Sequence, residues 1–192
     1  MKKIPSLFAR NHDTNGLLRN EVTPGCEWVI AGEGVATRKY DGACWMIRAG
    51  VLYKRRTLRE GEQSPAAFEP VTAFDPVTHT RYGWMPLSTE SPEDQYFREA
   101  LEAATQLLPD GTYELCGPMI QCNRERFTSH VLVPHGKDIL EDCPRDFHRL
   151  RDYLCNRDIE GIVWHHHDGR MAKIKGSDFG RRNARPGKPR RF

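Results

Sequence analysis

Residues 159–175 have the sequence IEGIVWHHHDGRMAKIK, which reads as two short strands and the turn between them. Apolar and β-branched side chains dominate the first strand, and Asp168-Gly169 is a dipeptide typical of tight hairpin turns. In the second strand Lys173 and Lys175 lie on one face and Ile174 on the other, because side chains alternate along a strand. The stretch therefore predicts an antiparallel hairpin with a basic face.

Patterning in the rest of the chain predicts more strands than helices. One helix is expected over residues 91–108, where a serine, a proline and two acidic residues form a typical helix start. A second helix is expected over residues 144–155. The expected strands are 28–30, 35–39, 43–48, 51–55, 112–116, 130–133, 159–165 and 171–175. The pattern predicts an α+β fold with mostly antiparallel sheets and a few flanking helices.

The chain of 192 residues has room for one well-cored domain, which we expect over residues 1–180. It contains no apolar run of ~18 residues, and its N-terminus lacks the apolar core of a secretory signal. We therefore expect no membrane association and a cytoplasmic location. The net charge of +3 is too small to indicate a nucleic-acid-binding protein by itself.

The distribution of that charge is more informative. Residues 181–192 carry six positive charges and no negative charge, so we expect a disordered basic tail. Attraction to a polyanion is the usual function of such a tail. A solvated terminus that only aids solubility is an equal alternative.

Cysteine and histidine give no clear metal motif. The six cysteines lack the short spacings of zinc ligands, so we expect small, partly buried apolar side chains in a reducing compartment. His165, His166 and His167 are adjacent on an expected strand, where neighbouring side chains point to opposite faces. We interpret them as exposed or phosphate-facing rather than as a metal site.

The motif Lys39-Tyr40-Asp41-Gly42 places a lysine at the end of an expected strand, before a carboxylate and a glycine. A simple turn would also explain it. The functional interpretation is a lysine nucleophile. The ordinary pKa of lysine is ~10.4, so it attacks only where burial, nearby cations or a metal favours its neutral form. Further basic side chains are therefore required, and they would also bind the phosphates of a nucleotide.

Candidate partners for Lys39 follow in order along the chain. They are the basic residues Lys54, Arg55 and Arg56, the strand carboxylate Glu114, the carboxylate Glu160 beside Gly161, and the pair Lys173 and Lys175. Each has a plain structural alternative when viewed alone, because solvent-facing carboxylates and lysines are common.

Taken together, this series resembles the covalent nucleotidyltransferase superfamily of ATP-dependent ligases and messenger RNA capping enzymes. The resemblance is greatest to RNA ligases, because Cys44 stands where DNA ligases and capping enzymes usually carry the arginine of K-x-D-G-x-R. It implies an ATP-grasp-like nucleotidyltransferase domain. Only 17 residues follow Lys175, too few for an oligonucleotide-binding barrel. The expectation is thus a minimal ligase, with the option of a partner protein that supplies a second domain.

The resemblance also implies catalytic roles. Lys39 attacks the α-phosphate of ATP and holds AMP as a phosphoramidate, and Asp41 orients Lys39 or a metal-bound water. Glu160 engages Mg²⁺ or Mn²⁺, which neutralises charge on the departing pyrophosphate. Lys173 and Lys175 grip phosphate.

The nucleotide-binding roles follow in the same way. Glu114 hydrogen-bonds the ribose hydroxyls, and either Arg55 or Arg56 contacts phosphate, with the choice between them left open. Ile162 or Val163 lies at the base, and the preference for adenine comes from the resemblance alone.

The implied activity is ATP-dependent joining of RNA 5′-phosphate and 3′-hydroxyl ends, in nicks or at free ends, as in RNA repair. The enzyme alternatives are a capping-type guanylyltransferase and a minimal DNA ligase. The non-enzyme alternative is a nucleic-acid-binding module with the same fold. Reaction with labelled ATP and, separately, GTP discriminates between these hypotheses.

Overall fold

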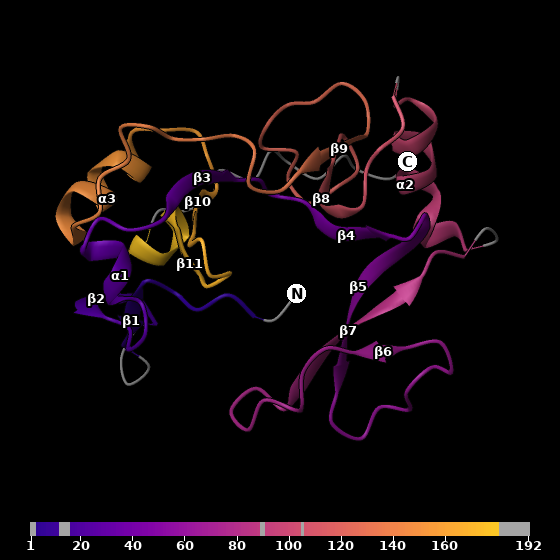
Figure 1. Cartoon of the computed structure of the whole chain (residues 1–192), viewed down its shortest axis with the longest axis horizontal. Helices are drawn as coiled ribbons and strands as arrows, with labels where there is room; N and C mark the ends of the chain where they lie inside the picture. The colour runs from indigo at the N-terminus through magenta and orange to yellow at the C-terminus, as the bar shows by residue number, and fades with distance from the viewer. Residues whose placement is uncertain (1–2, 12–15, 89–90, 105, 181–192) are drawn as a thin grey trace, which may run out of the picture. The chain divides into compact units, whose positions relative to one another are not determined.

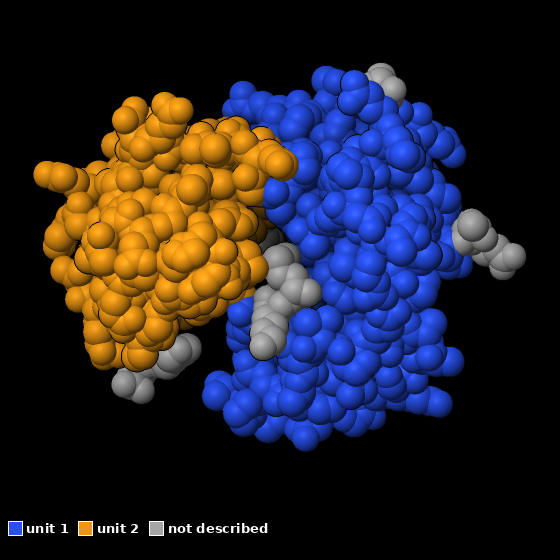
Figure 2. All heavy atoms as spheres, in the orientation of Figure 1, with its two compact units in different colours: residues 1–3, 42–135 blue, residues 4–41, 136–192 orange. Residues whose placement is uncertain are grey.

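The computed structural model describes residues 3–11, 16–88, 91–104 and 106–180, which form two compact units (Figure 2). Within these ranges, unit 1 contains Lys3 and residues 42–135, and unit 2 contains residues 4–41 and 136–180. The single domain expected over residues 1–180 stays a prediction. The expected tail, residues 181–192, lies outside the described residues.

Unit 2 is built on a three-stranded antiparallel sheet in the order β11-β10-β3 (Figure 1). These strands are β3 (Val35–Lys39), β10 (Gly161–His165) and β11 (Met171–Lys175). The other elements are the paired strands β1 (Phe8–Arg10) and β2 (Leu18–Val22), the helices α1 (Glu27–Ile30) and α3 (Phe147–Cys155), and the 3-10 turn η2 (Gly176–Phe179).

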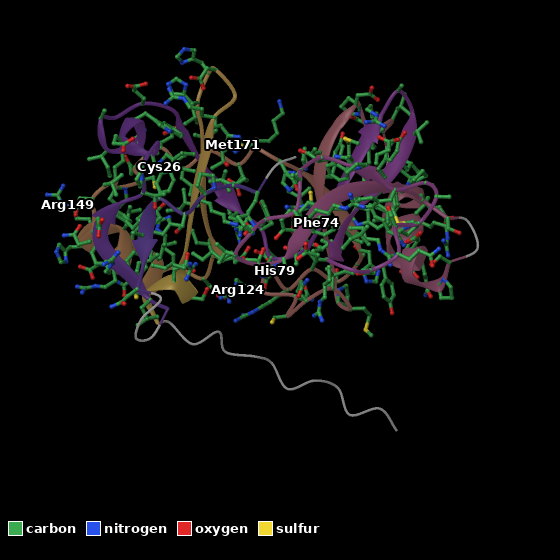
Figure 3. The ribbon with its side chains drawn as sticks, turned by 90° about the horizontal axis from the view of Figure 1, so that it is seen from below. Cys26, Phe74, His79, Arg124, Arg149 and Met171 are labelled. Carbon is green, nitrogen blue, oxygen red and sulfur yellow. The ribbon has the colours of Figure 1, made fainter. Side chains whose placement is uncertain are left out.

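The two faces of this sheet have different surroundings. Ile162, Trp164 and Ile174 share one face and belong to the core, where they cluster with apolar side chains of α1 and α3. Cys26 and Met171, labelled in Figure 3, also belong to unit 2, and Cys26 lies in the same core. Lys39 and Lys175 lie on the opposite face, since side chains alternate along each strand. The core face therefore fixes the register that positions the two lysines.

Unit 1 is built on a six-stranded antiparallel sheet in the order β6-β7-β5-β4-β8-β9 (Figure 1). The strands are β4 (Ala43–Arg48), β5 (Val51–Arg59), β6 (Glu69–Pro70), β7 (Thr80–Pro86), β8 (Gly111–Cys116) and β9 (Val131–Pro134). A 3-10 turn, η1 (Pro92–Asp94), leads into α2 (Gln95–Glu102).

The helix α2 covers one face of this sheet. Phe97 of α2 stacks on Trp45 of β4 with ring centroids 3.9 Å apart, and Ala100 and Leu115 complete the buried cluster. Such aromatic stacking contributes about 0.5–1.5 kcal/mol beyond the burial of area. Glu114, the neighbour of Leu115 on β8, consequently points to the other face of the sheet.

Most of the predicted elements are confirmed, and so is the α+β class with mostly antiparallel sheets. The hairpins β4–β5 and β10–β11 form as expected, and α3 begins at Phe147, where the side chain of Asp146 accepts a hydrogen bond from the Arg149 N–H. None of the helices among the described residues has the length and apolar character needed to cross a membrane.

One predicted strand is wrong, and one predicted helix is shorter than expected. Residues 28–30 form part of helix α1 rather than a strand, because Trp28 and Val29 are buried in the core of unit 2 as one helical turn. The helix expected over residues 91–108 ends at Glu102. Leu107, beyond the end of α2, is 98% exposed, so its side chain adds no buried contact that would stabilise a longer helix. Pro109 also disfavours the helical conformation of the residue before it.

Candidate functional site

One carboxylate and two lysines meet at the end of the three-stranded sheet in unit 2. Gly161 of β10 pairs with Lys39 of β3 on one side and with Lys175 of β11 on the other, so the three residues are in register. Glu160 precedes Gly161 in the chain. Its Oε2 lies 2.5 Å from Lys39 Nζ, and its Oε1 forms an ion pair with Lys175 Nζ.

The two lysines of this cluster are accessible to a ligand, whereas the carboxylate is largely buried. The side chain of Glu160 is 8% exposed, whereas those of Lys39 and Lys175 are 20% and 31% exposed. Two lysine side chains therefore contact one carboxylate near the surface of the unit. A buried carboxylate flanked by accessible cations can receive a phosphate group and a divalent metal ion.

Gly161 is what allows the two lysines to converge on Glu160. A Cβ atom at this position would lie 2.1 Å from the carbonyl oxygen of Ile174 and 2.9 Å from the Cα of Lys175. Both are backbone atoms, so β11 would have to move to accept any side chain here. The glycine thus sets the close approach of β10 and β11 beside the cluster.

The remaining residues predicted for this site occupy different positions. Lys173 pairs with Val163 and Lys175 with Gly161, so both lysines lie on the Lys39 face. Asp41 follows β3 by two residues. Ile162 is fully buried in the core on the opposite face, so its side chain does not lie with Lys39. Its expected place at the nucleotide base is not supported by this position.

Unit 1 holds a second set of predicted residues around Glu114. This carboxylate is 9% exposed. Its Oε1 accepts a hydrogen bond from the Gly42 N–H at 3.1 Å, and its Oε2 lies 2.8 Å from His135 Nε2. A side chain at Gly42 would collide with the carbonyl oxygen of Leu115 at 2.2 Å, so the glycine of the Lys39 motif is needed for the approach of β8.

The two arginines of the basic cluster point to opposite faces of the unit 1 sheet. Cys44 pairs with Glu114, and Met46 pairs with Tyr53. By the alternation of side chains, Arg55 shares the face of Glu114. The Arg55 guanidinium stacks 4.3 Å from the centroid of the Tyr82 ring.

Arg56 has the opposite orientation and donates a hydrogen bond to Glu62 Oε1 at 3.2 Å. Its neighbour Lys54 also faces away from Glu114 and forms an ion pair of 2.7 Å with the fully buried Asp94. The structure therefore brings Arg55, and not Arg56, to the face of Glu114.

Sequence patterns missed His135 and Thr112. His135 follows β9 directly, and its Nδ1 lies 3.0 Å from Thr112 Oγ1. A single histidine after a strand carries no spacing signal. Only knowledge that β8 and β9 pair, with Glu114 opposite Val133, would have placed it beside the carboxylate.

The interpretation of the three histidines as exposed or phosphate-facing is wrong for His166, which is 6% exposed. Its Nε2 lies 2.7 Å from Glu33 Oε2 and its Nδ1 lies 2.8 Å from Asp168 Oδ1. The hydrogen bond from the Arg170 backbone N–H, with further contacts from His166 and the Arg170 side chain, holds the pKa of Asp168 well below its usual range. His166 therefore anchors the β10–β11 turn.

Comparison with known protein families gives one match. A family model described as RNA ligase 1 matches residues 81–186, which is more than half of the chain. The matched range includes Glu114, Glu160 and Lys175, whereas Lys39 and Arg55 precede it. No curated protein sequence matches the chain.

Proposed function

Because the chain belongs to the RNA ligase 1 family, we propose that it is an ATP-dependent RNA ligase that joins 5′-phosphate and 3′-hydroxyl ends through an AMP group carried on Lys39. The observation that carries this proposal is the cluster of Lys39, Glu160 and Lys175. It combines an accessible amine with a carboxylate and a second cation, which are the groups that such a reaction needs.

The proposed first step is attack of the neutral Lys39 amine on the α-phosphorus of ATP. An N–P bond forms, the bond to the bridging oxygen breaks, pyrophosphate leaves, and the amine loses a proton. In the second step a 5′-phosphate oxygen of RNA takes the AMP group and releases Lys39. In the third, the RNA 3′-hydroxyl attacks this activated 5′-phosphate and AMP leaves.

The other residues have supporting roles in this proposal. Lys173 and Lys175 hold phosphate oxygens, and Asp41 orients the nucleophile. Glu114 accepts hydrogen bonds from the ribose hydroxyls, and Arg55 contacts phosphate. Arg55 is preferred to Arg56 because it shares the face of Glu114 and because Arg56 is engaged with Glu62.

Glu160 also fits the expected divalent cation. Mg²⁺ and Mn²⁺ prefer oxygen ligands and are commonly held by one or two carboxylates together with substrate phosphates. The Glu160 carboxylate provides such oxygens beside the nucleophile. The ion would neutralise charge on the departing pyrophosphate. Before the nucleotide binds, Lys39 and Lys175 form ion pairs with the same carboxylate.

Self-adenylylation tests this proposal. The protein is incubated with ATP labelled at the α-phosphate, and with GTP labelled in the same way, and then denatured and run on a gel. We expect an acid-labile, alkali-stable label from ATP that is absent in Lys39→Ala. Lys137→Ala, an exposed lysine of the same unit, is the matched control and should label like the unaltered protein.

The other possible outcomes would each assign a different activity, substrate or nucleophile. Labelling by GTP alone would assign a capping-type guanylyltransferase. Joining of pre-adenylylated DNA but not RNA would assign a DNA ligase. Persistent labelling of Lys39→Ala would move the nucleophile to another lysine, and no label at all would favour a nucleic-acid-binding module.

A further inference from the structure

We propose that Cys44, Glu114 and His135 of unit 1 form a binding site for a zinc-class divalent ion. Each residue offers one ligand atom, and the three ligand atoms lie within 4.8 Å of one another. A thiolate, an imidazole and a carboxylate are a donor set found in zinc sites, whereas Mg²⁺ selects oxygen ligands.

Three strands of the unit 1 sheet bring the ligands together. Cys44 of β4 and Glu114 of β8 are paired residues, so their side chains stand next to each other on one sheet face. His135 enters from the end of β9, and its Nε2 already lies 2.8 Å from Glu114 Oε2. Zinc ligands at about 2.0–2.3 Å in tetrahedral geometry stand roughly 3.3–3.8 Å apart, so a side-chain movement of about 1 Å closes the set.

Second contacts orient two of the three ligands. The Nδ1 of His135 lies 3.0 Å from Thr112 Oγ1, and the backbone N–H of His135 donates to the Thr112 carbonyl oxygen at 3.0 Å. The Nε2 atom is therefore directed at Glu114. The Oε1 of Glu114 accepts a hydrogen bond from the Gly42 N–H, and its Oε2 faces His135 Nε2, so an ion would replace the contact between Oε2 and Nε2. Metal-binding histidines usually have such a partner on their other ring nitrogen.

Accessibility and ligand number define the kind of site. Cys44 and His135 are half-buried and Glu114 is buried, so an ion can enter from the surface of the unit. Three protein ligands leave a fourth position open, which is the arrangement of reactive or regulatory zinc sites rather than of closed structural ones.

A functional consequence follows, and it rests on the proposed ligase activity. Glu114 is the carboxylate proposed to bind the ribose. The same oxygen atom cannot ligate an ion and accept a ribose hydrogen bond at full strength. Occupancy by Zn²⁺ should therefore slow self-adenylylation by competition for Glu114.

Metal binding is measured first, without reference to activity. The chelator-treated protein is titrated with Co²⁺, a spectroscopic substitute for Zn²⁺, and thiolate-to-cobalt charge-transfer absorption is recorded. We expect one equivalent to produce the band and Zn²⁺ to displace it. Cys44→Ser should abolish the band, whereas Cys122→Ser, another half-buried cysteine of unit 1, should retain it. His135→Ala should weaken Co²⁺ binding by more than 100-fold, and Thr112→Val by about 10–100-fold.

Failure of the site has clear signatures. A band that persists in Cys44→Ser, or the absence of stoichiometric Co²⁺ binding by the correctly folded protein, would overturn the proposal. Circular dichroism of each variant separates lost ligation from lost folding.

The second readout is the self-adenylylation rate with and without Zn²⁺, expressed for each variant relative to its own metal-free rate. Zn²⁺ should lower the self-adenylylation rate of the unaltered protein and of Cys122→Ser, whereas the rate of Cys44→Ser should be unchanged by Zn²⁺. If Zn²⁺ inhibits all three proteins to the same extent, the inhibition does not depend on Cys44, and the proposed competition for Glu114 is wrong. If the unaltered protein takes no label even without Zn²⁺, the ligase proposal fails, and the cobalt titration alone decides the metal site.

Discussion

At the scale of single residues, Glu160 has two bonding partners that compete for it. Its two carboxylate oxygens contact Lys39 and Lys175 separately. A lysine paired with a carboxylate is held in its charged form, which is the wrong form for attack. In the proposed reaction, Lys175 would therefore share the carboxylate with the nucleophile Lys39 and also offer a contact for phosphate.

Lys175→Ala should lower the rate of self-adenylylation by roughly 10- to 100-fold. Hydrogen bonds to charged groups contribute about 1.5–3 kcal/mol, and each 1.4 kcal/mol is about tenfold. The variant also removes one of the two lysines that contact Glu160. The measurement is the rate of label incorporation as a function of ATP concentration and pH.

Lys175→Arg is the informative companion, since it keeps the charge but changes the geometry of the contact. Partial recovery in this variant would support a role in holding phosphate. A normal rate and an unchanged pH profile in Lys175→Ala would assign Lys175 to the solvated face of the sheet.

The order of motifs in the sequence indicated the members of this cluster in unit 2, but not His135, the neighbour of Glu114 in unit 1. Lys39, Glu160 and Lys175 are brought together because the residues of three adjacent strands align at Gly161. Because side chains alternate along a strand, Ile162, the residue after Gly161, points into the core on the opposite face of the sheet. His135 had no local signal, because its position depends on strand pairing between distant segments.

At the scale of elements, the close approach of β10 and β11 depends on Gly161. Gly161→Ala should reduce self-adenylylation and lower the thermal midpoint, because the added Cβ meets backbone atoms that cannot rotate away. Forced overpacking of this kind typically costs about 1–3 kcal/mol. Thermal denaturation and label incorporation measure the two effects.

Gly111→Ala is the matched control. It also adds one methyl group to a strand glycine, but the nearest atom outside its chain neighbours is a Tyr113 ring carbon at 3.8 Å, an ordinary contact. Equal loss of activity in both variants would mean that the spacing of β10 and β11 has no special importance.

Strand prediction failed where tertiary packing decides the local structure. Short apolar runs such as residues 28–30 fit a buried helix as well as a buried strand. β7 was not predicted, and it contains Gly83, which usually weakens a strand. A Cβ at Gly83 would lie 2.3 Å from the Phe68 ring, so the glycine leaves space for this ring. The sequence pattern alone does not indicate that Phe68 packs against β7.

At the scale of the whole chain, charge at the C-terminus should govern polynucleotide binding. Replacement of the six basic residues in 181–192 by glutamine should weaken RNA binding and flatten its salt dependence. Each lost phosphate contact removes ~0.7 from the slope of log affinity against log salt for single strands, or roughly 4 if all six make contact. Self-adenylylation, which needs no polynucleotide, should be retained.

A nested variant sharpens this test. Replacement of only Lys188, Arg190 and Arg191 removes half of these charges and should give about half the change in slope. Binding measured at several salt concentrations provides both slopes. Identical slopes for the original and fully substituted tails would leave these residues with no role in RNA affinity.

The chain order of the two units has a consequence for how the protein is made. Residues 42–135 of unit 1 lie between the two segments of unit 2 in the sequence. β3 can pair with β10 only after residue 161 has been synthesised, whereas the β4–β5 hairpin needs only a two-residue turn. Pairing between distant segments is slow, because a long loop must close first. Lys39 is thus translated 121 residues before Glu160, so a chain that stops before Glu160 would contain Lys39 without the two residues with which it clusters in the folded unit.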